Sequence, residues 1–307
     1  MSPPQLLQKR DSYQATHATG FGASEAAAVV GQDPYCTPWE LYHRKTGDIP
    51  DKADSESIHL RRGIHLEPFI VAEYQRANPG QPIEYPMGTY CHPVHEFVIA
   101  SPDAGLSEVS GLECKFVGWR LADMIGEPGT NQLPPHWIIQ GQQQMAVMGW
   151  ESIVFAVLVE VETLKIYHVE RHEGIIEALI TAERELWERI QNREPPEPEC
   201  WAGHLDAVKK VFRDIDPGKV VHLTDKAKTA WARKREIDVA VKALEDERDT
   251  IKAQVYASLG DAQLGIIDGE KCIRRQMVKA STYTVERAER VDFREVKIPK
   301  GITVANG

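Results

Sequence analysis

Apolar residues recur at helical spacing in several stretches of the chain, and residues 224–259 form a long, charge-rich stretch without proline or glycine. In residues 58–78, for example, Ile70 and Tyr74 share one face, because residues four apart lie one turn above each other. Residues 20–47 begin with a glycine-rich segment, and Ser24 suits the N-cap of the alanine-rich helix that follows. The pattern predicts helices over residues 22–31, 37–47, 58–78, 134–150, 173–191 and 224–259.

Other stretches have the apolar and β-branched composition of strands, bounded by turn residues. The segment EFVIASPD is followed after a short loop by SGLECKFVGW, and two strands so close together predict a hairpin. Three hairpins are predicted, from residues 96–103 with 110–119, from 152–162 with 164–171, and near the end of the chain from 264–278 with 281–293.

The segment NREPPEPE is rich in proline and glutamate, which is typical of a linker between domains. We therefore predict a domain over residues 1–191, a linker over residues 192–204 and an extension over residues 205–307, consisting of a long helix and a β-hairpin.

The composition is that of an ordinary globular protein, with 42% hydrophobic and 27% charged residues. The longest apolar runs are about half the length that a membrane helix requires, and the first residues lack the apolar stretch of a signal peptide. We therefore expect no membrane association and a cytoplasmic location. The five cysteines contain no C-x-x-C pair, which argues against a zinc finger, an iron–sulfur cluster or a disulfide framework.

The net charge of −10 does not by itself favour a nucleic-acid partner, for which a basic surface is expected. The charge is distributed unevenly. Residues 205–307 hold 21 Lys and Arg against 17 Asp and Glu, a net charge of +4, whereas residues 1–204 hold 15 against 29, a net charge of −14. An acidic domain is compatible with a nuclease if several of its carboxylates gather around cations.

The segment GLECK carries the most informative chemistry. Alternation along a strand places Glu113 and Lys115 on the same face. If Asp103 ends the partner strand, its carboxylate meets that of Glu113, and two such groups repel each other unless a cation neutralises them. Mg²⁺ suits this role, because it binds a few carboxylates and keeps its waters and substrate phosphate oxygens. An Asp after Ser-Pro, with E-x-K ten residues later, is the PD-(D/E)xK signature of metal-dependent nucleases.

A longer series of motifs resembles the YqaJ-type viral recombinase family, which includes lambda exonuclease. The blocks GFGASEAAAVVGQDPYCTPWELYHRKTG, RRGIHLEP, ASPD, GLECK and PPHWIIQGQQQMAVMGW follow the order of that family over roughly residues 18–170. The resemblance implies an α/β fold with the restriction-endonuclease-like core of the PD-(D/E)xK nucleases, in which helices flank a central mixed β-sheet. It also implies a Mg²⁺ cofactor, for which Mn²⁺ can substitute.

Site residues follow from the same resemblance. The metal ligands would be Glu67, Asp103, Glu113 and the main-chain carbonyl of Cys114. In the catalytic group of Asp103, Glu113, Lys115 and Gln140, the lysine would activate the water and the glutamine would steady the lysine. Ser24 matches the serine that contacts the 5′-terminal phosphate. Gln142, which completes the Q-x-Q of the family, is expected at the same DNA end.

The sequence departs from the family at one position. Where family members often carry an arginine that binds the terminal phosphate, this chain has His17, seven residues before Ser24. A histidine binds phosphate only when it is protonated, and more weakly than a bidentate arginine does.

Three functions stay open at this point. The first is a 5′→3′ exonuclease that acts on the ends of linear double-stranded DNA and leaves 3′ overhangs for phage-type recombination. The second is an endonuclease or repair nuclease on the same core, and the third is a catalytically inactive DNA-binding module. The resemblance further implies a ring-shaped homo-oligomer and a single-strand annealing recombinase as the partner protein.

Overall fold

A computed structural model describes residues 4–8, 19–49, 58–160, 162–198, 204–215, 219–268 and 271–279. It contains two compact units, Met1–Arg213 and Asp214–Gly307. No helix among these residues has the length and apolarity needed to cross a membrane.

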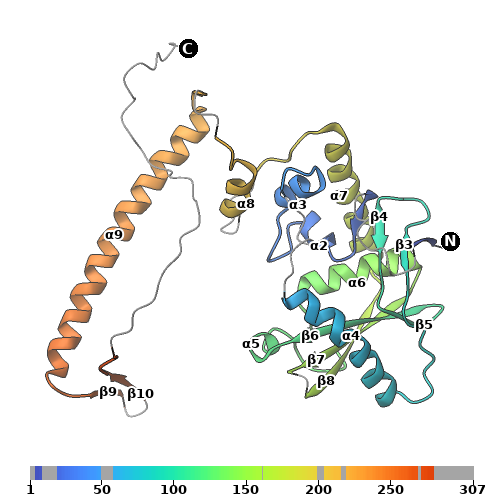
Figure 1. Cartoon of the computed structure of the whole chain (residues 1–307), viewed down its shortest axis with the longest axis horizontal. Helices are drawn as coiled ribbons and strands as arrows, with labels where there is room; N and C mark the ends of the chain where they lie inside the picture. The colour runs from blue at the N-terminus through green and yellow to red at the C-terminus, as the bar shows by residue number, and fades with distance from the viewer. Residues whose placement is uncertain are drawn as a thin grey trace. The chain divides into compact units, whose positions relative to one another are not determined.

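The first unit is built on a four-stranded sheet in the order β5-β6-β7-β8 (Figure 1). The strands are β5 (Ala104–Ser107), β6 (Ser110–Val117), β7 (Ser152–Val159) and β8 (Thr163–Glu170). The outer pairs are antiparallel, whereas β6 and β7 run parallel. The sheet is therefore mixed, and the hairpin predicted from residues 152–162 and 164–171 is confirmed.

Helices cover both faces of this sheet. Alternate residues of β7 pack in two different cores, with Phe155 in the core that includes Trp137 of α6 (Pro135–Met148) and Ala156 in the core that includes Ile70 of α4 (Ile58–Ala77). Because side chains alternate across a strand, α6 and α4 lie on opposite faces. Both helices were predicted from the sequence, and Gly149 ends α6 with a positive φ of 73°.

A second sheet contains four short strands in the order β1-β3-β4-β2. They are β1 (Gln5–Gln8), β2 (Phe21–Gly22), β3 (Thr89–Cys91) and β4 (Val98–Ala100). The hairpin predicted from residues 96–103 and 110–119 is therefore wrong, because β4 pairs with β3 and β2 and the antiparallel partner of β6 is β5. Pro102, which follows β4, has no N–H to continue a ladder, and the chain passes there from one sheet to the other.

The N-terminal helices pack against α7 (Glu173–Asn192), which matches the predicted helix 173–191. The two N-terminal helices are α2 (Ala26–Val29) and α3 (Pro38–Lys45). Elsewhere in the unit, the short α5 (Trp119–Ala122) follows β6. Helix α2 is shorter than expected, and Ser24 is not its N-cap. The cap is Glu25, whose carboxylate accepts a hydrogen bond from the N–H of Gly22 instead of from the helix.

The end of the first unit is α8 (His204–Val211), which contacts α3 and buries Ala207. The contacts thus divide the chain after Arg213, whereas the sequence predicts an extension from residue 205. The predicted domain boundaries stay a prediction.

The second unit contains the predicted long helix α9 (Asp225–Leu259), whose N-cap Thr224 accepts a hydrogen bond from the N–H of Ala227. An antiparallel hairpin follows, from β9 (Leu264–Asp268) and β10 (Lys271–Arg274). Both strands lie within the segment 264–278, and the expected partner segment 281–293 lies outside the described residues.

Candidate active site

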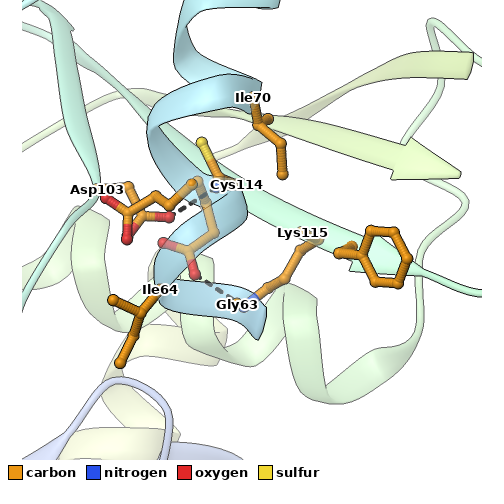
Figure 2. Close-up of a pocket in the computed structure, with 9 residues that line it drawn as sticks. Gly63, Ile64, Ile70, Asp103, Cys114 and Lys115 are labelled. Carbon is orange, nitrogen blue, oxygen red and sulfur yellow. Dashed lines mark hydrogen bonds and ion pairs between the residues drawn. The ribbon is translucent and has the colours of Figure 1, made fainter. Parts of the chain in front are cut away.

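A pocket of about 270 Å³ opens beside the second half of β6. Figure 2 shows Asp103 and Lys115 lying next to the stretch of α4 that carries Gly63, Ile64 and Ile70. The lining residues come from α4, from the turn before β5 and from β6, and they are Gly63, Ile64, Glu67, Ile70, Asp103, Glu113, Cys114, Lys115 and Phe116. The structure therefore brings together Glu67, Asp103, Glu113 and Lys115, which lie up to 48 positions apart in the sequence.

The shortness of β5 explains why the edge of β6 is accessible here. The β5–β6 ladder reaches only from Ser107 with Ser110 to Ala104 with Leu112. Beyond that point the Oδ2 atom of Asp103 accepts a hydrogen bond of 2.8 Å from the N–H of Cys114, in place of a strand carbonyl. The N–H and C=O of one strand residue point in the same direction, so the carbonyl of Cys114 faces the same open edge as the carboxylate of Asp103.

The side chain of Glu113 lies on the face of the sheet that α6 covers, and it is 4% exposed. Its Oε1 atom accepts hydrogen bonds from Lys115 Nζ at 2.8 Å and from Gln140 Nε2 at 2.5 Å. Its Oε2 atom accepts a hydrogen bond of 2.7 Å from Gln144 Nε2. Three donors thus hold a buried carboxylate in place, as a buried charge requires.

Lys115 lies between the carboxylate and the amide of this network. Its ammonium group donates to Glu113 and also to Gln140 Oε1, both at 2.8 Å. The same group lies 5.8 Å from the centre of the Trp137 ring. With Gln140 and Trp137 both on α6, this helix fixes the position of the lysine beside the pocket.

Negative charge dominates the electrostatics of the pocket. Burial raises the pKa of Asp103 well above its ordinary value, and the negative charges of Glu113 and Glu67 raise it further. The Cys114 N–H and the Lys115 charge oppose this shift without cancelling it. The pKa of the Cys114 thiol is likewise raised by burial, then by Asp103 and Glu113, so the thiol stays neutral.

Gly141 allows α6 to approach the sheet closely enough for these contacts. A Cβ atom at this position would lie 3.0 Å from Ile153 Cγ2 and 3.1 Å from the ring of Phe155, both fully buried residues of β7. The absence of a side chain at Gly141 therefore places its neighbour Gln140 within reach of Glu113 and Lys115.

Gln144 is a site residue that the sequence analysis missed. It follows Gln140 by four positions, so the two amides lie on one face of α6. The helical spacing from Gln140 could have identified it.

The structure does not bring Gln142 to the pocket, which corrects the expectation from the Q-x-Q pattern. Gln142 is 1% exposed and points to the other side of α6, because positions two apart do not share a helix face. Its Nε2 atom donates to the carbonyl of Glu170, and its Oε1 atom accepts from the N–H of His172. Gln142 thus holds α6 to the start of α7, and a DNA phosphate cannot reach it.

The donor chemistry of the pocket fits a hard divalent cation. Carboxylate and carbonyl oxygens are the ligands that Mg²⁺, Mn²⁺ and Ca²⁺ prefer, and the uncompensated charge around Asp103 would be relieved by such an ion. In the part of the chain that the structure describes, however, no three His, Cys, Asp or Glu side chains are already arranged around a metal position.

Besides Gln142, two residues are expected at the 5′ phosphate, Ser24 and His17, and they have different outcomes. Ser24 is exposed in the turn between β2 and α2, where its hydroxyl is accessible to a ligand. His17 lies outside the described residues.

Part of the chain matches a known protein family, and a similar protein is known over most of its length. Residues 12–151 match the family model of the YqaJ-like viral recombinase domain. The chain is 23% identical to the uncharacterised protein YqaJ of Bacillus subtilis (strain 168) over 293 residues, which cover 94% of this chain and 87% of that protein.

Two solved structures are similar to part of the chain. The alkaline exonuclease LHK-Exo from Laribacter hongkongensis is 22% identical, with a TM-score of 0.48 over 59% of this chain and 92% of its own. The structure of LHK-Exo in complex with dAMP, also 22% identical, gives a TM-score of 0.50 over 60% of this chain and 94% of its own. The chain thus shares its α/β fold with LHK-Exo, and its residues 12–151 are similar to the YqaJ-like viral recombinase domain.

Proposed function

We propose that this protein is a metal-dependent 5′→3′ exonuclease that degrades one strand of linear double-stranded DNA and leaves 3′ single-stranded overhangs. The observation that carries the proposal is the convergence of Glu67, Asp103, Glu113 and Lys115 on one pocket, within a YqaJ-like domain. Hydrolysis of a phosphodiester needs charge compensation at the phosphate and a positioned water, and this pocket has groups for both.

The carboxylates of Glu67, Asp103 and Glu113, together with the Cys114 carbonyl, would hold Mg²⁺, or Mn²⁺ in its place. Such an ion supplies positive charge at the phosphoryl oxygens and lowers the pKa of a bound water. Three of these groups carry negative charge and the fourth is a carbonyl dipole. Without a cation, bringing them together in a single pocket costs free energy.

Lys115 would orient the attacking water and stabilise the charge that develops on the phosphoryl group. It is suited to this role because Gln140 and Glu113 both hold its ammonium group at 2.8 Å, so little reorganisation is needed during the reaction. Gln140 and Gln144 act as positioning residues, since they contact Glu113 and Lys115 rather than the pocket itself.

The polarity of digestion would come from the N-terminal part of the domain. In the proposal, Ser24 binds the 5′-terminal phosphate through its exposed hydroxyl, and His17 adds a contact when it is protonated. A single-strand annealing recombinase would receive the 3′ overhangs, and the nuclease would act in the cytoplasm as a ring-shaped homo-oligomer.

A digestion assay tests this function. Purified full-length protein is incubated with linear and with closed circular duplex DNA, in Mg²⁺, in Mn²⁺ and in chelator, and each strand of the linear duplex carries a label at one end. With either cation we expect labels at the 5′ ends of linear DNA to be released before labels at the 3′ ends. We expect no release in chelator, and intact circles. Nicked or linearised circles would instead identify an endonuclease, and DNA binding without cleavage would identify a catalytically inactive module.

Matched variants connect the activity to the pocket. Glu113→Gln removes one negative charge from the proposed metal site, so we expect a loss of several kcal/mol of transition-state stabilisation, on the order of a thousandfold in rate. Glu108→Gln changes an exposed glutamate in the turn of the same hairpin and should cleave like the wild type. Near wild-type cleavage by Glu113→Gln would exclude the proposed site.

A further inference from the structure

Helix α9 exposes more apolar surface than a solvated helix of a single chain needs. None of its 35 residues is buried. Ile237, Val241, Leu244 and Ile251 are 47% to 64% exposed. Scattered apolar residues are normal on a protein surface, but a continuous apolar row on one helix marks an interaction surface.

These residues form such a row because their spacing alternates between four and three. In the heptad notation a to g, Val241 and Val255 occupy a positions, and Ile237, Leu244 and Ile251 occupy d positions. The row continues towards the N-terminal end of α9 through the smaller Ala230, at d, and Ala227, at a. A 3.5-residue repeat over several heptads is the pattern of a coiled-coil seam.

The residues at the remaining a positions favour two strands. They are Lys234 and Arg248, whose charged ends reach solvent more readily beside a two-stranded seam than inside a larger bundle. Val241 at a followed by Leu244 at d also matches the pattern of dimers, whereas Ile237 and Ile251 at d match that of larger bundles. A polar residue at a lowers stability but fixes the register of the helices.

DNA does not fit this face equally well. Residues 225–259 hold eight Lys and Arg and seven Asp and Glu, interspersed along the helix. Several of these charges pair within the helix, including Lys234 with Asp238 and Lys242 with Asp246. A helix that follows a phosphate backbone needs a predominantly basic face, which α9 lacks.

The charges that flank the seam identify the partner. In a parallel, in-register pair, a residue at g meets the residue five positions later, at e, on the other helix. Arg233 then meets Asp238 of the second copy, and Glu247 meets Lys252 of the second copy. The other flanking pair in the apolar part, Ala240 with Glu245, contains only one charged residue, so no like charges meet.

An antiparallel pair is less favourable. If Val241 packs against Leu244 of the other helix, Asp238 comes next to Glu245, and neither of the two attractive pairs forms. Within the described chain Glu247 makes no ion pair of its own, which leaves its carboxylate available to a second helix.

We propose that α9 associates with α9 of a second copy of this chain as a parallel, in-register, two-stranded coiled coil. This interface goes beyond the proposed nuclease function and does not depend on it. It joins two chains through their second units and leaves the candidate active site of each first unit unchanged.

Charge reversal on the full-length protein tests the pairing. Light scattering gives the mass of the wild type, of Glu247→Lys, of Lys252→Glu and of the matched control Glu245→Lys, while circular dichroism checks the helix content. We expect each of the first two variants to have half the wild-type mass, because each brings like charges together twice per dimer. Glu245→Lys should keep the wild-type mass, since its partner position is Ala240.

Mixing the variants tests the parallel orientation. An equimolar mixture of Glu247→Lys and Lys252→Glu restores both attractive pairs, so it should recover the wild-type mass and form mixed dimers that differently tagged chains reveal. A mass unchanged by the reversals, an equal effect of Glu245→Lys, or a mixture that stays dissociated would each overturn the proposal. Association through residues 280–307 would give the first of these results.

Discussion

Glu113 receives hydrogen bonds from three side chains and is almost fully buried, yet the proposal gives it a metal to hold. The hydrogen bonds and the proposed role as a metal ligand are compatible. This carboxylate shares a pocket with Asp103 and Glu67, and the hydrogen bonds from Lys115, Gln140 and Gln144 hold it in place there. In the proposal, these donors would keep the carboxylate in position to bind a cation.

Replacing Gln144 tests how far this support affects catalysis. Gln144→Met removes the donor to Glu113 Oε2, and hydrogen bonds to charged groups contribute about 1.5–3 kcal/mol. We expect a lower unfolding midpoint and a lower kcat, measured by urea denaturation and by digestion of linear duplex. Gln142→Met is the control, because its amide bonds only to the backbone at Glu170 and His172, and it should lose stability without a matching loss of kcat. Equal losses of kcat in the two variants would show that Gln144 has no role in catalysis beyond its effect on stability.

Glu183 of α7 is a second buried carboxyl group, with no hydrogen-bond partner for either oxygen among the described residues. Burial raises its pKa well above the ordinary value, the charge of Glu25 raises it further, and Lys45 opposes the shift. The folded protein therefore holds a proton that the unfolded chain releases. Stability is fully present below the pKa of the unfolded chain, about 4.3, and is lost as the pH rises towards the raised value.

The variant Glu183→Gln should remove this pH dependence. Between pH 5 and pH 8 we expect the unfolding free energy of the wild type to fall relative to that of the variant, by about 1.4 kcal/mol for each unit of pKa shift that the range covers. Urea denaturation at several pH values measures both. Glu185→Gln, at an exposed position of the same helix, should follow the wild type. Parallel curves for Glu183→Gln and the wild type would contradict the assignment of a proton to Glu183.

The turn between β2 and α2 is held by the last turn of α3. Lys45 Nζ donates to the carbonyl of Gly20 at 2.8 Å and to Glu25 Oε2 at 2.7 Å, and the same carboxylate oxygen accepts from the N–H of Gly22. The side chain of Lys45 is largely buried. These three hydrogen bonds fix the turn that contains Ser24. The sequence of the turn alone would allow many conformations.

Lys45→Met should lower the stability of the fold. It leaves Glu25 without its cation close to Glu183, and breaking a buried pair costs about 3–5 kcal/mol. Lys45→Met combined with Glu25→Gln removes the uncompensated charge, so chemical denaturation should show a smaller loss in the double variant than in the single one. A double variant as unstable as Lys45→Met would show that packing of the lysine stem, and not its charge, is what matters.

Ser24→Ala tests the end-binding role of this turn. The 5′ phosphate would lose a hydroxyl donor, and a hydrogen bond to a charged group contributes about 1.5–3 kcal/mol. We expect slower digestion from 5′-phosphorylated ends, by on the order of tenfold or more, and little change from 5′-hydroxyl ends. Because Glu25 and not Ser24 caps α2, the fold should be unaffected. Equal slowing on both kinds of end would exclude a contact with the phosphate.

The elements show which features the sequence could predict. Helices α4, α6, α7 and α9 were found because each is long and has apolar spacing or caps of its own. The partner of β6 was not found, since strand pairing depends on contacts that no local pattern contains, and the three-residue β4 lies close to β5 in the sequence. In the site, motif spacing identified Glu113 and Lys115 but not Gln144, whose role follows from the direction in which α6 faces the sheet.

All the candidate site residues that the structure describes belong to the unit Met1–Arg213, and α9 with its hairpin belongs to Asp214–Gly307. Chemistry and association are thus proposed for separate units. Helix α8 belongs to the first unit, since Ala207 is buried and α8 contacts α3. A truncation that separates the two functions should therefore keep α8.

Truncation after Arg213 is expected to leave a folded, metal-dependent nuclease. Truncation after Arg193 also removes α8, so it should unfold at a lower denaturant concentration, and comparing the two midpoints tests where the boundary lies. If the second unit only associates chains through α9, the shorter protein has a lower mass in light scattering while its affinity for DNA ends keeps the same salt dependence. If that unit also binds DNA, the slope of log K against log salt becomes shallower by about 0.9 for each phosphate that the shorter protein no longer neutralises. An inert or insoluble protein after truncation at Arg213 would show that the first unit does not fold without the rest of the chain.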